Sequence, residues 1–284
     1  EFRHNQSDLL LNGNKAFLRG TLECCVFPLT GRPPMEPEGW KKVFLTAREW
    51  GLNHLRFHSW CPPEAAFQVA DSLGFYLQVE LPLWSLSVGQ DQKTNEYLYA
   101  EADRILSEYG NHPSFVMQCI GNELGNSDFE VMESWMKPLR EKDSRRLYAV
   151  STARKVMPVD QYMATHYIDG LGSTRGLRGG ASTAWDFEDV YSKSDIPILS
   201  HEIGQWPVYP KWEEIKKYTG VLKAKNFEIF RETSKDHHMA DLADAFLYAS
   251  GRLQTLCYKA DIEAALRTPG FAGFQLLDLH DFPG

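Results

Sequence analysis

Residues 52–80, with the sequence LNHLRFHSWCPPEAAFQVADSLGFYLQVE, contain one complete unit of a pattern that recurs along the chain. Short apolar runs at 53–57 and 76–81 predict two β-strands, and the amphipathic segment 64–73 between them predicts a helix. A strand, a helix and a second strand in this order are typical of parallel strands joined by a crossover helix. The unit therefore predicts an α/β fold.

The same alternation of strand and helix extends over most of the 284 residues. Eight apolar runs predict strands at 16–23, 53–57, 76–81, 115–120, 147–151, 162–166, 198–202 and 273–277. Amphipathic segments predict helices at 38–50, 64–73, 96–109, 128–143 and 212–266. Because eight strands alternate with helices in a chain of single-domain length, we predict one (β/α)8 barrel, the TIM-barrel architecture, over residues 1–284.

Three shorter stretches refine this architecture. Residues 170–180 are glycine-rich and predict a loop in place of a helix. Residues 9–20, LLLNGNKAFLRG, predict an Asn12-Gly13 hairpin that leads into the first strand. The end of that strand, FLRGTLECC, contains no GxGxxG, so a closed barrel is favoured over a doubly wound sheet.

The composition is that of an ordinary globular protein and limits the classes of partner. The 38 acidic residues exceed the 30 basic ones, and the net charge of −8 disfavours nucleic acid or an anionic membrane as main partner. No apolar run reaches the roughly 18 residues that a membrane span needs. The polar start EFRHNQSDLL lacks the hydrophobic region of a signal peptide. Because the predicted Asn12-Gly13 hairpin leads straight into a strand with no leader before it, we expect an excised domain of a longer protein.

Catalytic groups of a barrel enzyme occupy the carboxyl ends of the strands, where loops build a pocket over a rigid base. The fourth predicted strand ends in Asn122 and Glu123, and the seventh ends in Glu202. Cleavage of a glycosidic bond requires one carboxylic acid to protonate the leaving oxygen and one carboxylate to attack or stabilise the anomeric carbon. Glu123 and Glu202 therefore predict a glycosidase site.

Two of these stretches have a form that is known from one family of enzymes. Residues 109–125, YGNHPSFVMQCIGNELG, resemble the acid/base signature of glycoside hydrolase family 2, which includes β-galactosidases, β-glucuronidases and β-mannosidases. Residues 195–206, DIPILSHEIGQW, resemble its nucleophile segment. Residues 47–84 resemble its second and third βα units, and residues 12–20 its entry hairpin, so the resemblance extends over nearly the whole chain.

The resemblance implies a retaining double displacement that uses no cofactor. Glu202 would form a covalent glycosyl-enzyme, and Glu123 would first protonate the leaving group and then activate water. The two carboxyl groups should then lie about 5 to 5.5 Å apart. The resemblance also implies that the pKa of Glu123 is raised beside the negative Glu202, which stays ionised.

The same resemblance assigns binding residues. Arg56, at the end of the second strand, matches the family arginine beside the nucleophile, and Asn122 matches the residue that hydrogen-bonds the sugar 2-hydroxyl. Tyr167 matches a family tyrosine close to the nucleophile, although packing alone would also account for it. Glu80 is a third acid near a strand end, and we interpret it as support for the site.

Five further side chains are candidates from their positions. His58, His166 and His201 fall at strand ends, where they could line a sugar pocket, polarise the acids or only satisfy local hydrogen bonds. Trp84 and Trp206 follow the third and seventh strands and are candidate platforms for a sugar ring. These five complete the predicted substrate-binding set.

The chain departs from the family at the positions that commonly hold tryptophan. Gln118 occupies one such position in the fourth strand, and Leu276 or Leu277 occupies the position in the eighth strand that often floors the sugar site. We therefore expect an unusual sugar. Arg32 in the first loop, together with Arg56, leaves an acidic sugar open.

Two other classes of function stay open. A metal-dependent barrel hydrolase is disfavoured because HEIGQ carries Gln205 where HExxH needs its second histidine, and because His237-His238 has no partner acid arrangement. The five cysteines show no CxxC or zinc-ligand spacing, so we predict no metal site. A catalytically silent sugar-binding barrel is disfavoured because both acids are in place.

The family implies the remaining partners. The substrate would be an oligosaccharide or polysaccharide from which a terminal sugar is removed, and the parent protein would carry flanking β-sandwich domains. Family resemblance alone favours export to the periplasm or the cell exterior. The identity of the sugar and its linkage do not follow from these residues.

Overall fold

A computed structural model describes residues 1–85, 87–153, 155–178 and 182–280. Its centre is an eight-stranded parallel sheet in the order β8-β7-β6-β5-β4-β13-β12-β9. The strands are β4 (Leu18–Glu23), β5 (His54–Phe57), β6 (Tyr76–Glu80), β7 (Phe115–Gly121), β8 (Leu147–Ser151), β9 (Met163–Thr165), β12 (Ile198–Ile203) and β13 (Gly273–Leu276). The predicted (β/α)8 architecture is confirmed, and the eight predicted strands each coincide with one of these within two residues.

Single backbone hydrogen bonds join the two strands at the ends of this order. The amide of Gln161 donates to the carbonyl of Tyr148 in β8 over 2.9 Å, and the amide of Ala153 donates to the carbonyl of Ala164 in β9 over 3.1 Å. The sheet therefore curves into a nearly closed barrel, and the carboxyl ends of all eight strands point to one mouth.

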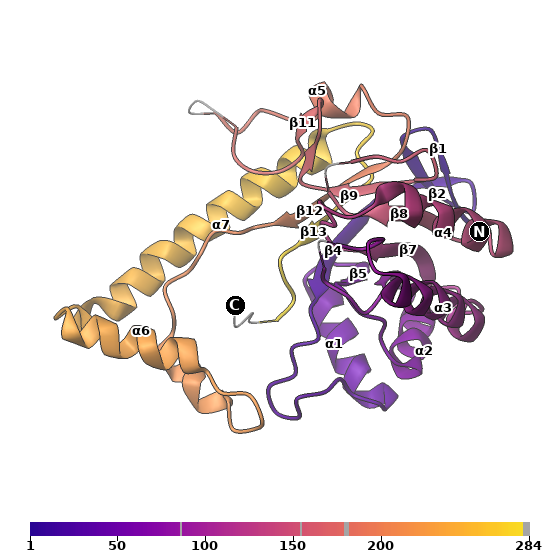
Figure 1. Ribbon diagram of the computed structural model, residues 1–284. Helices are drawn as coiled ribbons and strands as arrows, with labels where there is room; N and C mark the ends of the chain where they lie inside the picture. The colour runs from indigo at the N-terminus through magenta and orange to yellow at the C-terminus, as the bar shows by residue number, and fades with distance from the viewer. Residues whose placement is uncertain (86, 154, 179–181, 281–284) are drawn as a thin grey trace.

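Helices cover the outside of the barrel (Figure 1). They are α1 (Pro37–Glu49), α2 (Glu64–Leu73), α3 (Gln92–Tyr109), α4 (Phe129–Lys142) and the short α5 (Glu188–Tyr191). In α1 the buried side chains Trp40, Phe44 and Ala47 recur at helical spacing, so one stripe faces the sheet. Helix α3 begins four residues before its predicted start, because the Asp91 carboxylate caps it by accepting the amide of Thr94 over 2.7 Å.

The stretch after β9 is irregular, as its glycines predict. A small hairpin pairs β10 (Tyr167–Ile168) with β11 (Gly172–Ser173). Strand β10 precedes the predicted loop 170–180, and β11 lies within it. Residues 179 and 180 of that loop lie outside the described residues. Strand β9 is shorter than predicted and ends at Thr165. His166 therefore lies just beyond the strand, between two short segments of sheet.

The predicted helical region 212–266 is four separate segments. They are η1 (Trp212–Lys217), α6 (Lys225–Asp236), η2 (Ala240–Leu242) and α7 (Ala243–Arg267). In Figure 1, α6 and the first part of α7 project away from the barrel, and only the last part of α7 packs on it, where Cys257, Asp261 and Ala264 are buried. The single predicted helix over 212–266 is therefore replaced by four segments, of which only the end of α7 covers the barrel.

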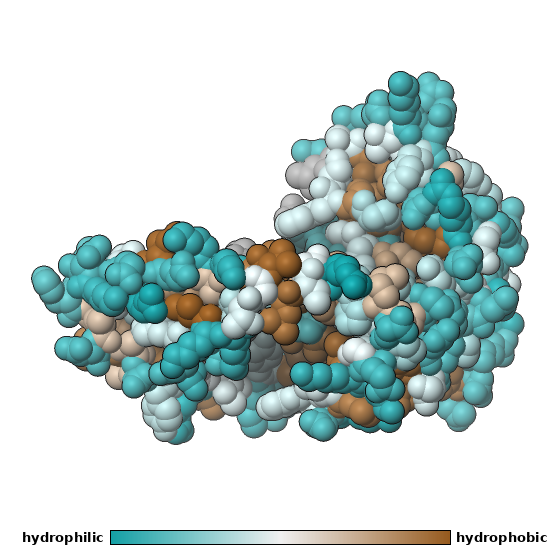
Figure 2. Space-filling view, turned by 90° about the horizontal axis from the view of Figure 1, so that it is seen from below, coloured by the Kyte–Doolittle hydropathy of each residue, from teal (hydrophilic) through white to brown (hydrophobic). Residues whose placement is uncertain are grey.

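The surface of this projection carries mixed residues. Figure 2 shows hydrophobic groups among hydrophilic ones along it, and Ile229, Phe230 and Tyr248 are exposed. Within the described residues, none of the helices combines the length and the apolar character that a membrane crossing requires.

The amino-terminal sheet closes the opposite end of the barrel. It consists of β1 (Phe2–Asn5), β2 (Asp8–Leu11) and β3 (Asn14–Ala16), and Asn12 and Gly13 turn between the last two with positive φ angles of 50° and 82°. The predicted hairpin is therefore confirmed. Phe2 and Leu9 are buried in a cluster with residues near the starts of the barrel strands, among them Leu18, Val116, Leu147 and Ala272.

We expect Leu9→Ala to lower the free energy of unfolding by about 2–4 kcal/mol, because it leaves a cavity beneath the barrel. Leu10→Ala, in the same strand but with a partly exposed side chain, should cost about 1 kcal/mol or less. Urea titrations followed by circular dichroism measure both values. Equal losses would contradict the assignment of this sheet as the closure of the barrel.

Candidate active site

Glu123 and Glu202 line one pocket of about 350 Å³ at the carboxyl ends of the strands. Glu123 follows β7, and Glu202 lies near the end of β12. Both residues have positive φ angles, 49° and 54°, which are uncommon for residues with a side chain. Such conformations cluster at functional sites, where the surrounding structure holds them in place. The walls of the pocket are completed by Cys24, Cys25, His58, Ser59, Trp60, Trp84, Asn122 and Leu277.

Arg56 lies beneath this pocket and contacts several of its residues. Its side chain is fully buried, and Nε lies 2.7 Å from Oε1 of the equally buried Glu80. Nη2 donates to Oδ1 of Asn122 over 2.6 Å, and the hydroxyl of Thr152 donates to the same oxygen over 2.9 Å. Nη1 lies 3.9 Å from Oε1 of Glu202. One guanidinium thus connects the ends of four strands.

Glu80 is held in turn by a buried polar network. Its Oε2 accepts the amide of Ser59 over 2.8 Å, and its Oε1 accepts Nε2 of Gln78 over 3.2 Å. Gln275 donates to Oε1 of Gln78 and lies 2.9 Å from Nε2 of His54. Burial lowers the pKa of His54 to about 4, so its ring is uncharged at neutral pH. Neutral donors and acceptors therefore support the charged pair.

Four basic side chains surround the carboxylate of Glu202. Nε2 of His58 lies 3.7 Å and Nδ1 of His201 lies 3.6 Å from Oε1. Nη1 of Arg175 lies 3.8 Å from Oε2 and donates to the backbone carbonyl of the same residue over 2.7 Å. With Arg56, they hold Glu202 in one orientation.

Burial raises the pKa of Glu202. The positive charge of Arg56 opposes this effect, the negative charge of Glu123 adds to it, and Arg175 opposes it again. The sequence predicts an ionised Glu202 from its family role beside Arg56, but it does not reveal the burial of this carboxyl group. Loss of solvation thus acts against ionisation of the residue expected to carry the charge.

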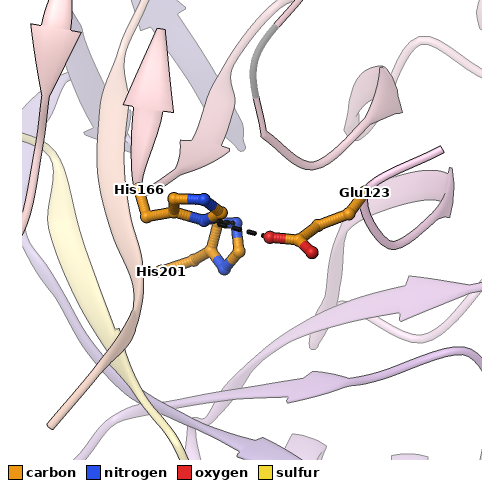
Figure 3. A group of neighbouring side chains, drawn as sticks. All are labelled: Glu123, His166 and His201. Carbon is orange, nitrogen blue, oxygen red and sulfur yellow. Dashed lines mark hydrogen bonds and ion pairs between the residues drawn. The ribbon is translucent and has the colours of Figure 1, made fainter. Parts of the chain in front are cut away.

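The carboxylate of Glu123 faces two histidines (Figure 3). Its Oε1 lies 3.1 Å from Nδ1 of His166, and the same nitrogen lies 3.2 Å from Nε2 of His201. The backbone amide of Glu123 donates to the hydroxyl of Thr152 over 3.1 Å. Side chains that follow β7 and β9 and one from within β12 therefore meet at one point.

The predicted aromatic residues lie in different surroundings. Trp84 lines the pocket with 68% of its surface exposed, and its ring stands edge-on to His58 at 5.6 Å between centroids. Trp206 packs against Tyr258 and does not line the pocket. Tyr167 is 43% exposed in β10 and is not a pocket-lining residue either. The structure therefore brings only Trp84 of these three to the two acids.

The structure also shows where the residues lie that replace the tryptophans common in the family. Gln118 is buried within β7, and Leu277 lines the pocket where Leu276 packs on the core. Arg32 lies in an exposed loop and does not line this pocket. The floor of the pocket is therefore aliphatic beside the eighth strand.

Two charged residues at this end of the barrel were missed by the sequence analysis. Glu23 is fully buried at the end of β4, where Oε1 accepts the amide of Cys25 over 2.7 Å and Oε2 lies 3.1 Å from Nε2 of His280. The strand-end rule would have found it, since it ends the first strand as Glu80 ends the third. Arg175 lies in an irregular stretch that gives no such signal.

A family model matches most of the chain. The model of the family described as glycosyl hydrolases family 2, TIM barrel domain, matches residues 2–205. No curated protein sequence matches the chain significantly.

Several solved structures share the fold. A β-glucuronidase from Parabacteroides merdae is 18% identical, with a TM-score of 0.56 over 71% of this chain and 26% of its own. A β-galacturonidase from Eisenbergiella tayi bound to galacturonate is 15% identical, with a TM-score of 0.67 over 98% of this chain and 46% of its own. A β-D-mannosidase from Dictyoglomus thermophilum is 15% identical, with a TM-score of 0.59 over 97% of this chain and 37% of its own. This chain thus spans less than half the length of each.

We expect Glu123→Gln to lower the pKa of Glu202, because it removes a nearby negative charge that disfavours ionisation. Arg175→Met should raise the same pKa, because it removes a positive charge that favours the carboxylate. The carboxyl carbon shift of Glu202, assigned by its loss in Glu202→Gln, measures both against pH. Glu188→Gln, at an exposed residue of α5, is the control and should change nothing. A constant pKa in all variants would show that these charges do not act on Glu202.

Proposed function

Because this chain belongs to glycosyl hydrolase family 2, we propose that it hydrolyses glycosidic bonds with retention of configuration, through Glu202 as nucleophile and Glu123 as general acid/base. The observation that carries the proposal is the shared pocket, into which two strand-end glutamates from β7 and β12 project. Their surroundings differ, since the Glu123 side chain is 31% exposed and the Glu202 side chain is 11% exposed. An acid that exchanges protons with water is expected at the more open position.

The reaction has two displacements. In the first, an oxygen of Glu202 bonds to the anomeric carbon, the bond to the leaving oxygen breaks, and Glu123 gives its proton to that oxygen. In the second, Glu123 takes a proton from a water molecule as the oxygen of that water attacks the anomeric carbon, and the ester bond to Glu202 breaks. Arg56 and Arg175 keep the nucleophile oriented and favour its charged form.

Neighbouring groups support substrate binding in this proposal. Arg56 and Thr152 both donate to the amide oxygen of Asn122, so its Nδ2 can donate to a sugar hydroxyl. Trp84 offers an exposed indole beside the pocket for stacking on a sugar face. His58 lines the same pocket, where its ring stands 5.6 Å from Trp84 between centroids and its Nε2 lies 3.7 Å from Oε1 of Glu202.

The substrate in this proposal is an oligosaccharide or polysaccharide that loses a terminal sugar. Flanking β-sandwich domains of a longer protein are part of the same proposal, because the similar solved structures extend well beyond the region matched here. A catalytically silent sugar-binding barrel is the rival, and the presence of both acids in one pocket disfavours it.

Glu202→Ala should lose turnover of aryl glycosides, because no group is left to attack the anomeric carbon. Added azide should restore turnover by entering the vacated space, and the product should be a glycosyl azide of inverted configuration, identified by NMR. Glu188→Ala, at an exposed residue, should keep wild-type rates. A wild-type chain that binds sugars but cleaves no glycoside in a broad panel would support the silent barrel. Turnover by the parent protein alone would instead show that flanking domains complete the pocket.

Glu123→Ala should lose about 10²- to 10⁴-fold in kcat/KM on substrates with a poor leaving group, which need general acid catalysis. The loss should be much smaller for a dinitrophenyl glycoside, whose leaving group departs without a proton. Steady-state kinetics on the two substrates measure the ratio. Equal losses on both would contradict the role of Glu123 as the acid.

A further inference from the structure

We propose that Glu123, His166 and His201 form a binding site for a divalent transition-metal ion, with Zn²⁺ as the best match. The family-based role of Glu123 requires no metal, and the sequence carries no metal motif that joins these residues. In the structure, one potential ligand atom from each residue lies within 4.8 Å of the other two (Figure 3). Two imidazole nitrogens and a carboxylate oxygen are the ligands of many zinc sites.

Two of the three separations are close to those around a tetrahedral ion, and the third is below 4.8 Å. Zinc binds nitrogen and carboxylate oxygen at about 2.0–2.2 Å, so neighbouring tetrahedral ligands lie roughly 3.3–3.5 Å apart. The Glu123 oxygen is 3.1 Å from Nδ1 of His166, and that nitrogen is 3.2 Å from Nε2 of His201. Small rotations of these side chains would bring all three atoms to the same distance from one ion.

The second nitrogen of His201 supports the assignment. A metal-bound histidine usually gives its other ring N–H to a carboxylate, which fixes the ring and increases its basicity. Nδ1 of the fully buried His201 lies 3.6 Å from Oε1 of Glu202, and within the described part of the chain it has no hydrogen-bond partner of normal length. This ring is therefore already oriented with Nε2 toward the cluster and Nδ1 toward an acid.

The charges around the cluster are also compatible with a cation. Glu80 and Glu202 face Arg56 and Arg175, whereas the described residues contain no lysine or arginine within ion-pair distance of Glu123. If the imidazoles are uncharged, the carboxylates of Glu80, Glu123 and Glu202 exceed the two guanidiniums by one negative charge. Glu123 also lines the open pocket, so an ion can enter and water can occupy the fourth position.

Metal binding would have one consequence for the reaction, and this consequence rests on the proposed function. An ion on Oε1 of Glu123 replaces the proton that the acid would donate to the leaving oxygen. Zn²⁺ should therefore inhibit cleavage of substrates with a poor leaving group, and a chelator should reverse the inhibition.

The binding itself is tested without substrate. Competition of the wild-type chain with a chromophoric chelator should give one tight Zn²⁺ site, and Co²⁺ in its place should show the visible absorption of a tetrahedral ion. His166→Asn and His201→Asn should each weaken Zn²⁺ binding at least about tenfold, because each removes a ligand. His58→Asn is the matched control, since His58 lies in the same pocket but outside the cluster and should leave the affinity unchanged.

Two outcomes would overturn the proposal. One is unchanged Zn²⁺ affinity in both cluster variants, with folding verified by circular dichroism. The other is loss of the site on replacing the exposed tract His237-His238 by asparagine. A chain that binds Zn²⁺ through His166 and His201 yet cleaves no glycoside would refute the proposed function alone, and an active chain without this affinity would refute the metal site alone.

Discussion

The buried ion pair between Arg56 and Glu80 is the interaction on which the site depends. Neither side chain is exposed, and removing one partner from such a pair costs about 3–5 kcal/mol because the other charge is left without compensation. The pair joins β5 to β6 at the barrel mouth, and the same guanidinium contacts Asn122 and approaches Glu202. The segments that carry Glu123 and Glu202 are therefore positioned by a buried ion pair of the barrel itself rather than by the surface loops.

The parts of the structure that follow local rules were predictable from the sequence. Strands such as 147–151 and helices such as 64–73 were predicted to the residue, because apolar periodicity and turn residues act within a few positions. The positions of Glu123 and Glu202 at one mouth followed from the topology, since parallel strands in a barrel end on one side. Their chemical roles rest on the family and stay a proposal.

The remaining features depend on contacts between distant segments. Arg175 reaches Glu202 from an irregular stretch, and the projection of α6 follows from tertiary packing that helical periodicity does not encode. The raised pKa of Glu202 arises from burial, which is a property of the folded pocket. The cluster of Glu123, His166 and His201 also forms only in the folded chain, because its members belong to three separate segments, after β7, after β9 and within β12. Sequence motifs of closely spaced metal ligands therefore do not predict it.

The two histidines also link the proposed nucleophile to the proposed acid. Contacts run from Glu202 to His201 over 3.6 Å, from His201 to His166 over 3.2 Å, and from His166 to Glu123 over 3.1 Å. Because the same Nδ1 of His166 faces both His201 and Glu123, the tautomer of His166 decides whether this nitrogen donates a hydrogen bond or accepts one. A metal ion and a proton would thus compete for the same lone pairs, and the geometry that makes Glu123 accessible to substrate is also the geometry that exposes it to a cation.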